Sequence, residues 1–224
     1  MSAPPLWLAV HEAGHAVAHL VLDELPPYPG PHIISVSVKP DAADGSLGRV
    51  SGRRRTSTLR TPPHTKPVPA AHPEVLADMR RQARYDIVEL LAGRMAESYQ
   101  RGGPYCPLRW TDEIVSKTIN GDPDAGGDMS FVRKTLDWLE LPDPAAELKR
   151  LWRITYGLIA SEWPGIVRIA RILRERRFMG GEDFEAEWRA GRSTPAMRQR
   201  LEKRLGDGLA GWRDGLVGAA QVWA

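Results

Sequence analysis

Cysteine is nearly absent from this chain. Cys106 is the only cysteine among 224 residues, which excludes an internal disulfide framework and any zinc site made of cysteines alone. A large surplus of charge is missing too, because 31 basic residues stand against 28 acidic ones and leave a net charge of +3. Charge therefore demands neither a nucleic-acid partner nor an anionic membrane surface, and we expect no nucleic-acid partner.

Long apolar runs and targeting signals are also lacking. The most apolar stretch near the start, residues 6–22, is interrupted by Glu12 and three histidines, whereas a membrane-spanning helix needs roughly 20 predominantly apolar residues. No lysine or arginine precedes Lys39, so the start of the chain does not have the pattern of a secretory signal. We expect a cytoplasmic protein without a membrane segment.

The composition is that of one globular domain. Apolar residues make up 42% of the chain and charged residues 26%, which is enough for a core without disulfide or metal staples. We expect residues 1–224 to form a single domain.

Helical patterns dominate the sequence. Residues 4–22 begin with two prolines and end before Pro26-Pro27, and residues 74–100 are rich in good helix formers. The second stretch spaces six apolar residues for one buried face: Tyr85, Val88, Leu91, Ala92, Met95 and Tyr99. Further helices are predicted over residues 111–119, 128–140, 144–161, 164–178, 181–190 and 194–206.

A small β element is predicted between the first two helices. Residues 32–39 alternate apolar and polar from Ile34 onward, and residues 47–50 fit a returning strand after a turn at Asp44-Gly45. The fold class is therefore mainly α (α+β), with a small β hairpin or sheet after the first helix.

Two other segments have the composition of exposed chain. Residues 53–73 contain Arg53-Arg54-Arg55 and five prolines, which predicts an exposed loop. The C-terminal tail, residues 207–224, ends in apolar residues around Trp223 that either pack on the body or make a homo-oligomer contact.

The chemistry of the chain is concentrated in an HExxH motif, His11-Glu12-Ala13-Gly14-His15, in the first predicted helix. Four residues make about 1.1 helical turns, so both imidazoles project from one face and can bind one ion. Zinc accepts two neutral imidazoles and leaves room for a third ligand and a water, whose pKa it lowers to about 7. Glu12 then lies beside the metal, where it can take a proton from that water. The alternative is a buried helix with two hydrogen-bonded histidines.

The third ligand has to come from another part of the chain. His19 follows His15 by four residues, but His11 and His19 would lie about 12 Å apart along a helix axis, too far for one ion. We expect His19 in the core or behind the ligands. The downstream carboxylates all remain candidates: Asp86, Glu89, Glu97, Asp112, Asp124 and Asp128. Asp128 also fits the alternative role of a helix N-cap after Gly126-Gly127.

Residues 11–17, His-Glu-Ala-Gly-His-Ala-Val, resemble the peptidase domain of FtsH-type zinc metalloproteases, peptidase family M41. Residues 91–97, Leu-Ala-Gly-Arg-Met-Ala-Glu, resemble the GGRAAE helix of that family, and residues 126–129 resemble the segment that carries its aspartate ligand. The strand pair and the helices across residues 163–188 are similar as well. The resemblance covers most of residues 6–190.

This resemblance implies a zincin-type helical peptidase domain with Zn2+ as its cofactor. His11, His15 and Asp128 are then the metal ligands and Glu12 is the catalytic base. Asp124 and Glu97 remain the alternatives to Asp128.

The resemblance also implies how a polypeptide substrate binds. A strand edge after the zinc helix would pair with the extended substrate, and it consists of Leu47, Gly48, Arg49 and Val50. A chain of this length leaves no room for the ATPase module of the family beside the peptidase domain. We therefore expect an ATP-independent, stand-alone zinc metalloendopeptidase that acts on short or loosely folded polypeptides, or on substrates that a separate unfoldase or adaptor delivers.

Two other function classes compete with this interpretation. The first is a catalytically silent, peptidase-like adaptor or scaffold, whose behaviour would not depend on Glu12. The second is a nucleic-acid binder that uses Arg53-Arg54-Arg55, although aromatic residues are not interleaved with these arginines.

Overall fold

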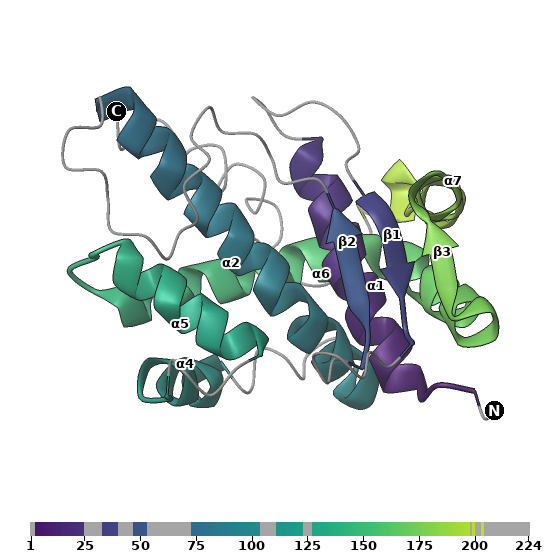
Figure 1. Cartoon of the computed structure of the whole chain (residues 1–224), viewed down its shortest axis with the longest axis horizontal. Coiled ribbons are helices and arrows are strands. Elements are labelled where there is room, and N and C mark those ends of the chain that lie inside the picture. Colours follow the sequence, from purple (N-terminus) through teal and green to yellow (C-terminus); the bar gives the residue numbers. More distant parts are fainter. Residues whose placement is uncertain are drawn as a thin grey trace.

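The computed structural model describes residues 3–24, 33–39, 47–52, 73–103, 111–122 and 127–197, together with residues 199 and 203. Most of these residues lie in helices: α1 (Leu6–Asp23), α2 (Pro73–Gly102), α4 (Thr111–Ile119), α5 (Asp128–Trp138), α6 (Pro144–Arg176) and α7 (Gly181–Gly191). Three short strands, β1 (Ile33–Ser37), β2 (Arg49–Gly52) and β3 (Phe178–Gly180), form an antiparallel sheet in the order β2-β1-β3 (Figure 1). The prediction of a mainly helical fold with a small sheet is confirmed.

Helix α1 lies at the centre of the core. Nearly every residue from Leu8 to Asp23 is buried, because α2 and α6 pack against this helix and β1 and β2 also contact it. A Cβ atom on Gly14 would come within 2.8 Å of the carbonyl oxygen of Ala92 and of the Cβ of Ala96. Glycine and alanine therefore let α1 and α2 touch almost backbone to backbone, which places the HExxH turn directly against α2.

The face of α2 that the sequence predicts to be buried is buried. Its six apolar residues, Tyr85, Val88, Leu91, Ala92, Met95 and Tyr99, all belong to the core. The prediction ended the preceding loop at Pro73, but Pro73 is the first residue of α2. Proline is well suited to that position, because its fixed φ matches the helix and its missing N–H would have had no helical partner.

Helix α6 is one helix of 33 residues, so the prediction of two helices over 144–161 and 164–178 was wrong. Pro164 lies inside this helix, where a proline removes a hydrogen bond and costs about 3 kcal/mol or more. Apolar residues on both sides of Pro164, among them Ile159 and Ile166, are completely buried. Each such side chain contributes roughly 1.5–3 kcal/mol on burial, which offsets the cost and keeps the helix continuous.

The pairing of β1 with β2 is confirmed, with Val36 opposite Val50, and the predicted turn at Asp44-Gly45 lies outside the described residues. Strand β3 was not predicted. Its three residues pair with β1 through Val36 opposite Met179 and Ser37 opposite Phe178. Three residues are too few to show alternation, and the partner strand lies far away in the sequence. The order of the sheet leaves β2 at an edge, beside the HExxH helix (Figure 1).

Several sequence predictions fall on residues outside the described ranges. They concern the loop over residues 53–72 with its three arginines, the tail over residues 207–224, and Cys106 and Asp124. Of the predicted helix over 194–206, residues 195–197, 199 and 203 are helical. In the described part of the chain, no helix is both long enough and apolar enough to cross a membrane.

Candidate metal centre

Three side chains from two helices direct one ligand atom each to a common point. The Nε2 atoms of His11 and His15 on α1 are 2.9 Å apart, and each lies 3.2 Å from Oδ2 of Asp128 on α5. A triangle with these sides has a circumradius of about 1.8 Å, so an ion at the usual zinc–ligand distance of about 2.0–2.1 Å fits roughly 1 Å to one side of it. The three residues could therefore hold a metal ion.

The second ring nitrogen of each histidine determines which nitrogen faces this point. Nδ1 of His15 lies 2.7 Å from the backbone carbonyl oxygen of Glu89. A carbonyl oxygen only accepts hydrogen bonds, so Nδ1 carries the hydrogen and Nε2 keeps its lone pair for a metal. Nδ1 of His11 likewise lies 2.7 Å from Oε1 of Glu97, and Arg101 lies 3.2 Å from the other oxygen of that carboxylate. Histidine ligands of metals are typically supported in this way.

The electrostatics of the site favour positive charge between the three ligand atoms. Burial disfavours the charged form of His11, but hydrogen bonds to Asp128 and Glu97 outweigh it and raise the pKa of His11 to about 9. Burial likewise disfavours the charged form of Asp128, but hydrogen bonds to His11 and His15 hold its pKa well below the usual range. Two imidazole nitrogens and one carboxylate oxygen are a donor set that suits zinc.

Helix α2 contacts the two histidines through a glycine. A Cβ atom on Gly93 would lie 2.3 Å from Nε2 of His15 and 2.8 Å from Nε2 of His11, so any larger residue would overlap with both ligand nitrogens. The contact of Gly93 with the two histidines was not predicted from the sequence, in which Gly93 contributed only to the resemblance over residues 91–97. The available signal was the glycine itself, because glycine inside a helix costs about 1 kcal/mol relative to alanine and so needs a reason to be there.

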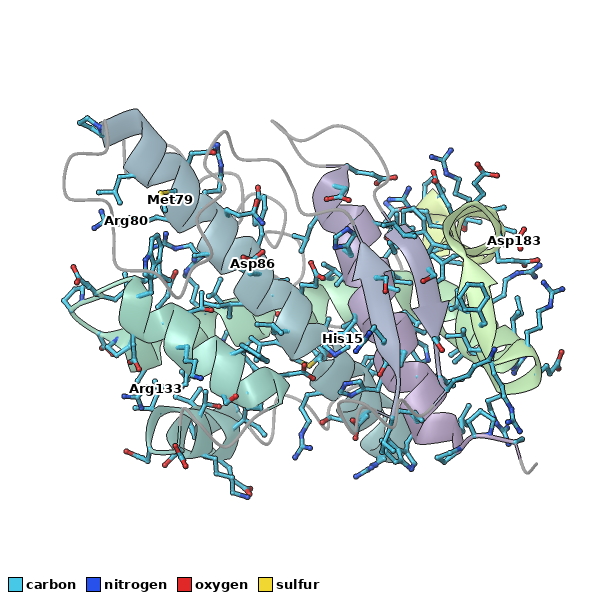
Figure 2. All side chains as sticks on the ribbon, in the orientation of Figure 1. His15, Met79, Arg80, Asp86, Arg133 and Asp183 are labelled. Carbon is cyan, nitrogen blue, oxygen red and sulfur yellow. The ribbon has the colours of Figure 1, made fainter. Side chains whose placement is uncertain are left out.

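Glu12 lies beside the ligands and is covered by the start of the β2 segment. It is only 7% exposed, and burial raises the pKa of its carboxyl even though both histidines oppose the shift. A Cβ atom on Gly48 would lie 2.5 Å from Oε1 of Glu12. In Figure 2, His15 lies between α2 and β2. Helix α1, helix α2 and the β2 edge therefore meet at the HExxH motif.

The four residues of the predicted substrate edge differ in exposure. Gly48 is brought against Glu12, Val50 is half-buried in the hairpin, and Leu47 and Arg49 are exposed. Their contact with a substrate stays a prediction.

The remaining ligand candidates are engaged elsewhere or lie outside the described residues. Glu97 contacts Nδ1 of His11 and thus supports a ligand from behind. Asp86 accepts a hydrogen bond from Gln82, and Asp112 pairs with Lys149 at the surface. Asp124 lies outside the described ranges.

His19 is buried, as expected for a residue in the core behind the ligands. Its Nδ1 lies 3.0 Å from the carboxylate of Glu89, and its Nε2 lies 3.3 Å from that of Asp23. The alternative of Asp128 as an N-cap was wrong, because Gly127, with φ 77°, caps α5 and Asp128 is the first helical residue. A carboxylate at that position is also favoured by the positive end of the helix dipole.

No protein-family model and no curated protein matches this chain. The resemblance to M41 peptidases therefore stays a prediction, and the function has to be argued from the chemistry of the metal centre.

Proposed function

We propose that this protein is a zinc-dependent metalloendopeptidase of the zincin type, which hydrolyses peptide bonds in polypeptides. The observation that carries the proposal is the convergence of His11 Nε2, His15 Nε2 and Asp128 Oδ2 within 3.2 Å of one another, with Glu12 beside them. Structural zinc sites are closed by four protein ligands, whereas catalytic sites use three and leave one position open. Among the described residues three ligand atoms converge beside a neighbouring carboxylate, which favours catalysis over a purely structural role.

The role of each residue in the proposed mechanism follows from its surroundings. A bound zinc ion would polarise the scissile carbonyl and lower the pKa of water. Glu12 takes the proton of the attacking water and passes it to the leaving amine, and its burial suits this exchange because a raised pKa lies closer to neutral pH. The Nδ1–H groups of His11 and His15 donate to the carboxylate of Glu97 and the carbonyl of Glu89, which turns the Nε2 atom of each ring toward the metal position.

An extended polypeptide is the substrate class that the surroundings of the site favour. Within the described residues, β2 has a strand neighbour on one side only, and the segment that leads into it lies against Glu12. A peptide that pairs with the outer edge of β2 would bring its backbone past the metal centre, and pairing through backbone hydrogen bonds accepts many sequences. Loosely folded chains, or chains that a separate unfoldase or adaptor delivers, can supply such a segment.

The decisive experiment combines a metal measurement with one conservative substitution. We expect purified protein to bind about one zinc ion per chain, as a three-ligand site with one open position does, and to cleave unfolded casein. Glu12→Gln should retain the zinc and lose cleavage by about 10²–10⁴-fold, because general base catalysis contributes a factor of that size. Glu182→Gln makes the same chemical change at an exposed position of α7 and should cleave at the wild-type rate.

Two outcomes would contradict the proposed peptidase activity. Wild-type protein that binds no zinc removes the basis of the mechanism. Protein that binds zinc but behaves identically with and without the Glu12 carboxylate favours the catalytically silent adaptor or scaffold instead.

A further inference from the structure

We propose that Gly48 is a positioning residue for Glu12, so that the absence of a side chain at position 48 keeps the carboxylate aimed at the metal centre. This inference rests on the proposed function and assigns a role that the HExxH motif does not contain. It concerns a residue just outside β2, which begins at Arg49.

The contact between the two residues is closer than any side chain at position 48 would allow. A Cβ atom on Gly48 would lie 2.5 Å from Oε1, 2.6 Å from Cδ and 2.6 Å from Cγ of Glu12. Carbon atoms in contact prefer a separation of about 3.5–4.0 Å. The three nearest atoms all belong to Glu12, so the side chain of Glu12 is the first obstacle that a side chain at position 48 would meet.

The backbone does not explain the glycine. The φ angle of Gly48 lies outside the left-handed region that favours glycine, so other residues can adopt its conformation. Gly103 and Gly127 show the opposite case, because their φ angles are 73° and 77° and nothing lies within 4 Å of a Cβ atom on either. Gly103 and Gly127 are therefore explained by their backbone conformation, whereas Gly48 is explained by its close contact with the side chain of Glu12.

The response to a side chain at position 48 follows from what can move. Glu12 belongs to α1, whose backbone is fixed between α2, α6 and the sheet, and its side chain can rotate. An added methyl group would therefore displace the carboxylate from its position and leave helix and metal ligands in place. Loss of catalysis without loss of metal is the signature of this role.

The test uses the full chain loaded with zinc and compares Gly48→Ala with Gly180→Ala. Gly180 lies in the same sheet, has φ −70°, and has nothing within 4 Å of an added Cβ, which makes it a matched control. Three measurements are made: the zinc affinity, the steady-state kinetics (kcat and KM) with an unfolded casein peptide, and the affinity of acetohydroxamic acid. The hydroxamate binds zinc and gives up a proton to a neighbouring carboxylate, so it reports the position of Glu12 without turnover.

We expect Gly48→Ala to bind zinc within about threefold of wild type, to lose at least about tenfold in kcat with little change in KM, and to bind the hydroxamate at least about fivefold more weakly. Gly180→Ala should match wild type in all three. Glu12→Asp shortens the side chain by one methylene group, so it should cost less activity in the Gly48→Ala background than in wild type. A merely structural glycine would not produce that coupling.

The proposal is overturned if Gly48→Ala keeps wild-type kcat and hydroxamate affinity, if it loses zinc, or if the effects of the two substitutions multiply independently. Wild-type protein that binds zinc and hydroxamate but cleaves nothing rejects the peptidase, while the hydroxamate measurements still decide the role of Gly48. A wild-type chain without zinc affinity overturns both proposals.

Discussion

Substitution of Gly93 by alanine tests whether helix α2 and the two histidines of α1 form one metal-binding unit. Gly93 lies inside a long helix, where alanine is the better helix former by about 1 kcal/mol. Propensity alone thus predicts that Gly93→Ala stabilises the protein. The contact with the histidines predicts that the same substitution weakens metal binding.

The size of the effect follows from the distances. The added Cβ would lie 2.3 Å from Nε2 of His15 and 2.8 Å from Nε2 of His11, whereas atoms in contact prefer about 3.5–4.0 Å. One or both imidazoles must therefore move by about 1 Å, and metal–ligand distances tolerate only about 0.2 Å. Overpacking of this kind costs about 1–3 kcal/mol, so the metal-free protein should lose at most about 2 kcal/mol after the gain in helix propensity.

We expect the zinc affinity of Gly93→Ala to fall by at least about 100-fold, since even loss of an outer support of a ligand costs about 10–100-fold. Competition with a chromophoric chelator measures the affinity, and urea unfolding in the presence of EDTA measures the stability of the metal-free fold separately. Gly180→Ala again provides the control. If Gly93→Ala binds zinc within about threefold of wild type, the two ligand nitrogens do not depend on this contact and the reasoning fails.

Three further results are expected. Glu97→Gln should lower zinc affinity by about 10-fold and Glu97→Ala by up to about 100-fold, because the carboxylate orients His11 through Nδ1; unchanged affinity in a chelator competition would contradict this role. Zinc has to displace the proton that His11 holds up to a pKa of about 9, and hydrogen bonding to Asp128 raises the pKa of His15 as well. The apparent Kd should therefore fall by at least about tenfold per pH unit between pH 6 and pH 8, and a flat profile would exclude His11 as a ligand. Free zinc at about 100 times its Kd should stabilise the fold by about 2.7 kcal/mol and raise Tm by about 5–11 °C, a shift that calorimetry should find abolished in Asp128→Asn.

The parts of the site that follow from one helix were predictable from the sequence. His11 and His15 are four residues apart, and helical periodicity alone places them on one face. The same argument excluded His19 as a ligand of the ion, and in the structure His19 is buried against Asp23 and Glu89. The predicted bounds of α1, α2, α4 and α7 also lie within a few residues of the observed ones, because proline and glycine mark helix ends chemically.

The parts that depend on contacts between distant elements were not predictable in this way. The spacing of residues along the sequence could not identify the third ligand among six candidate carboxylates, because the position of Asp128 depends on where α5 packs. The continuity of α6 through Pro164 and the pairing of β3 with β1 are likewise results of packing. Local propensity is overridden wherever buried area on both sides exceeds the local cost.

Three glycines have in common that they allow close contact with the HExxH turn. Gly14 within the motif lets α2 approach α1, Gly93 gives room to the ligand nitrogens, and Gly48 gives room to the carboxylate of Glu12. A helix that carries HExxH by chance has no reason to meet small residues at all of these points. The glycines around the motif therefore support the interpretation of the HExxH turn as a metal site, since they let rigid elements hold His11, His15 and Glu12 in one arrangement at van der Waals distance.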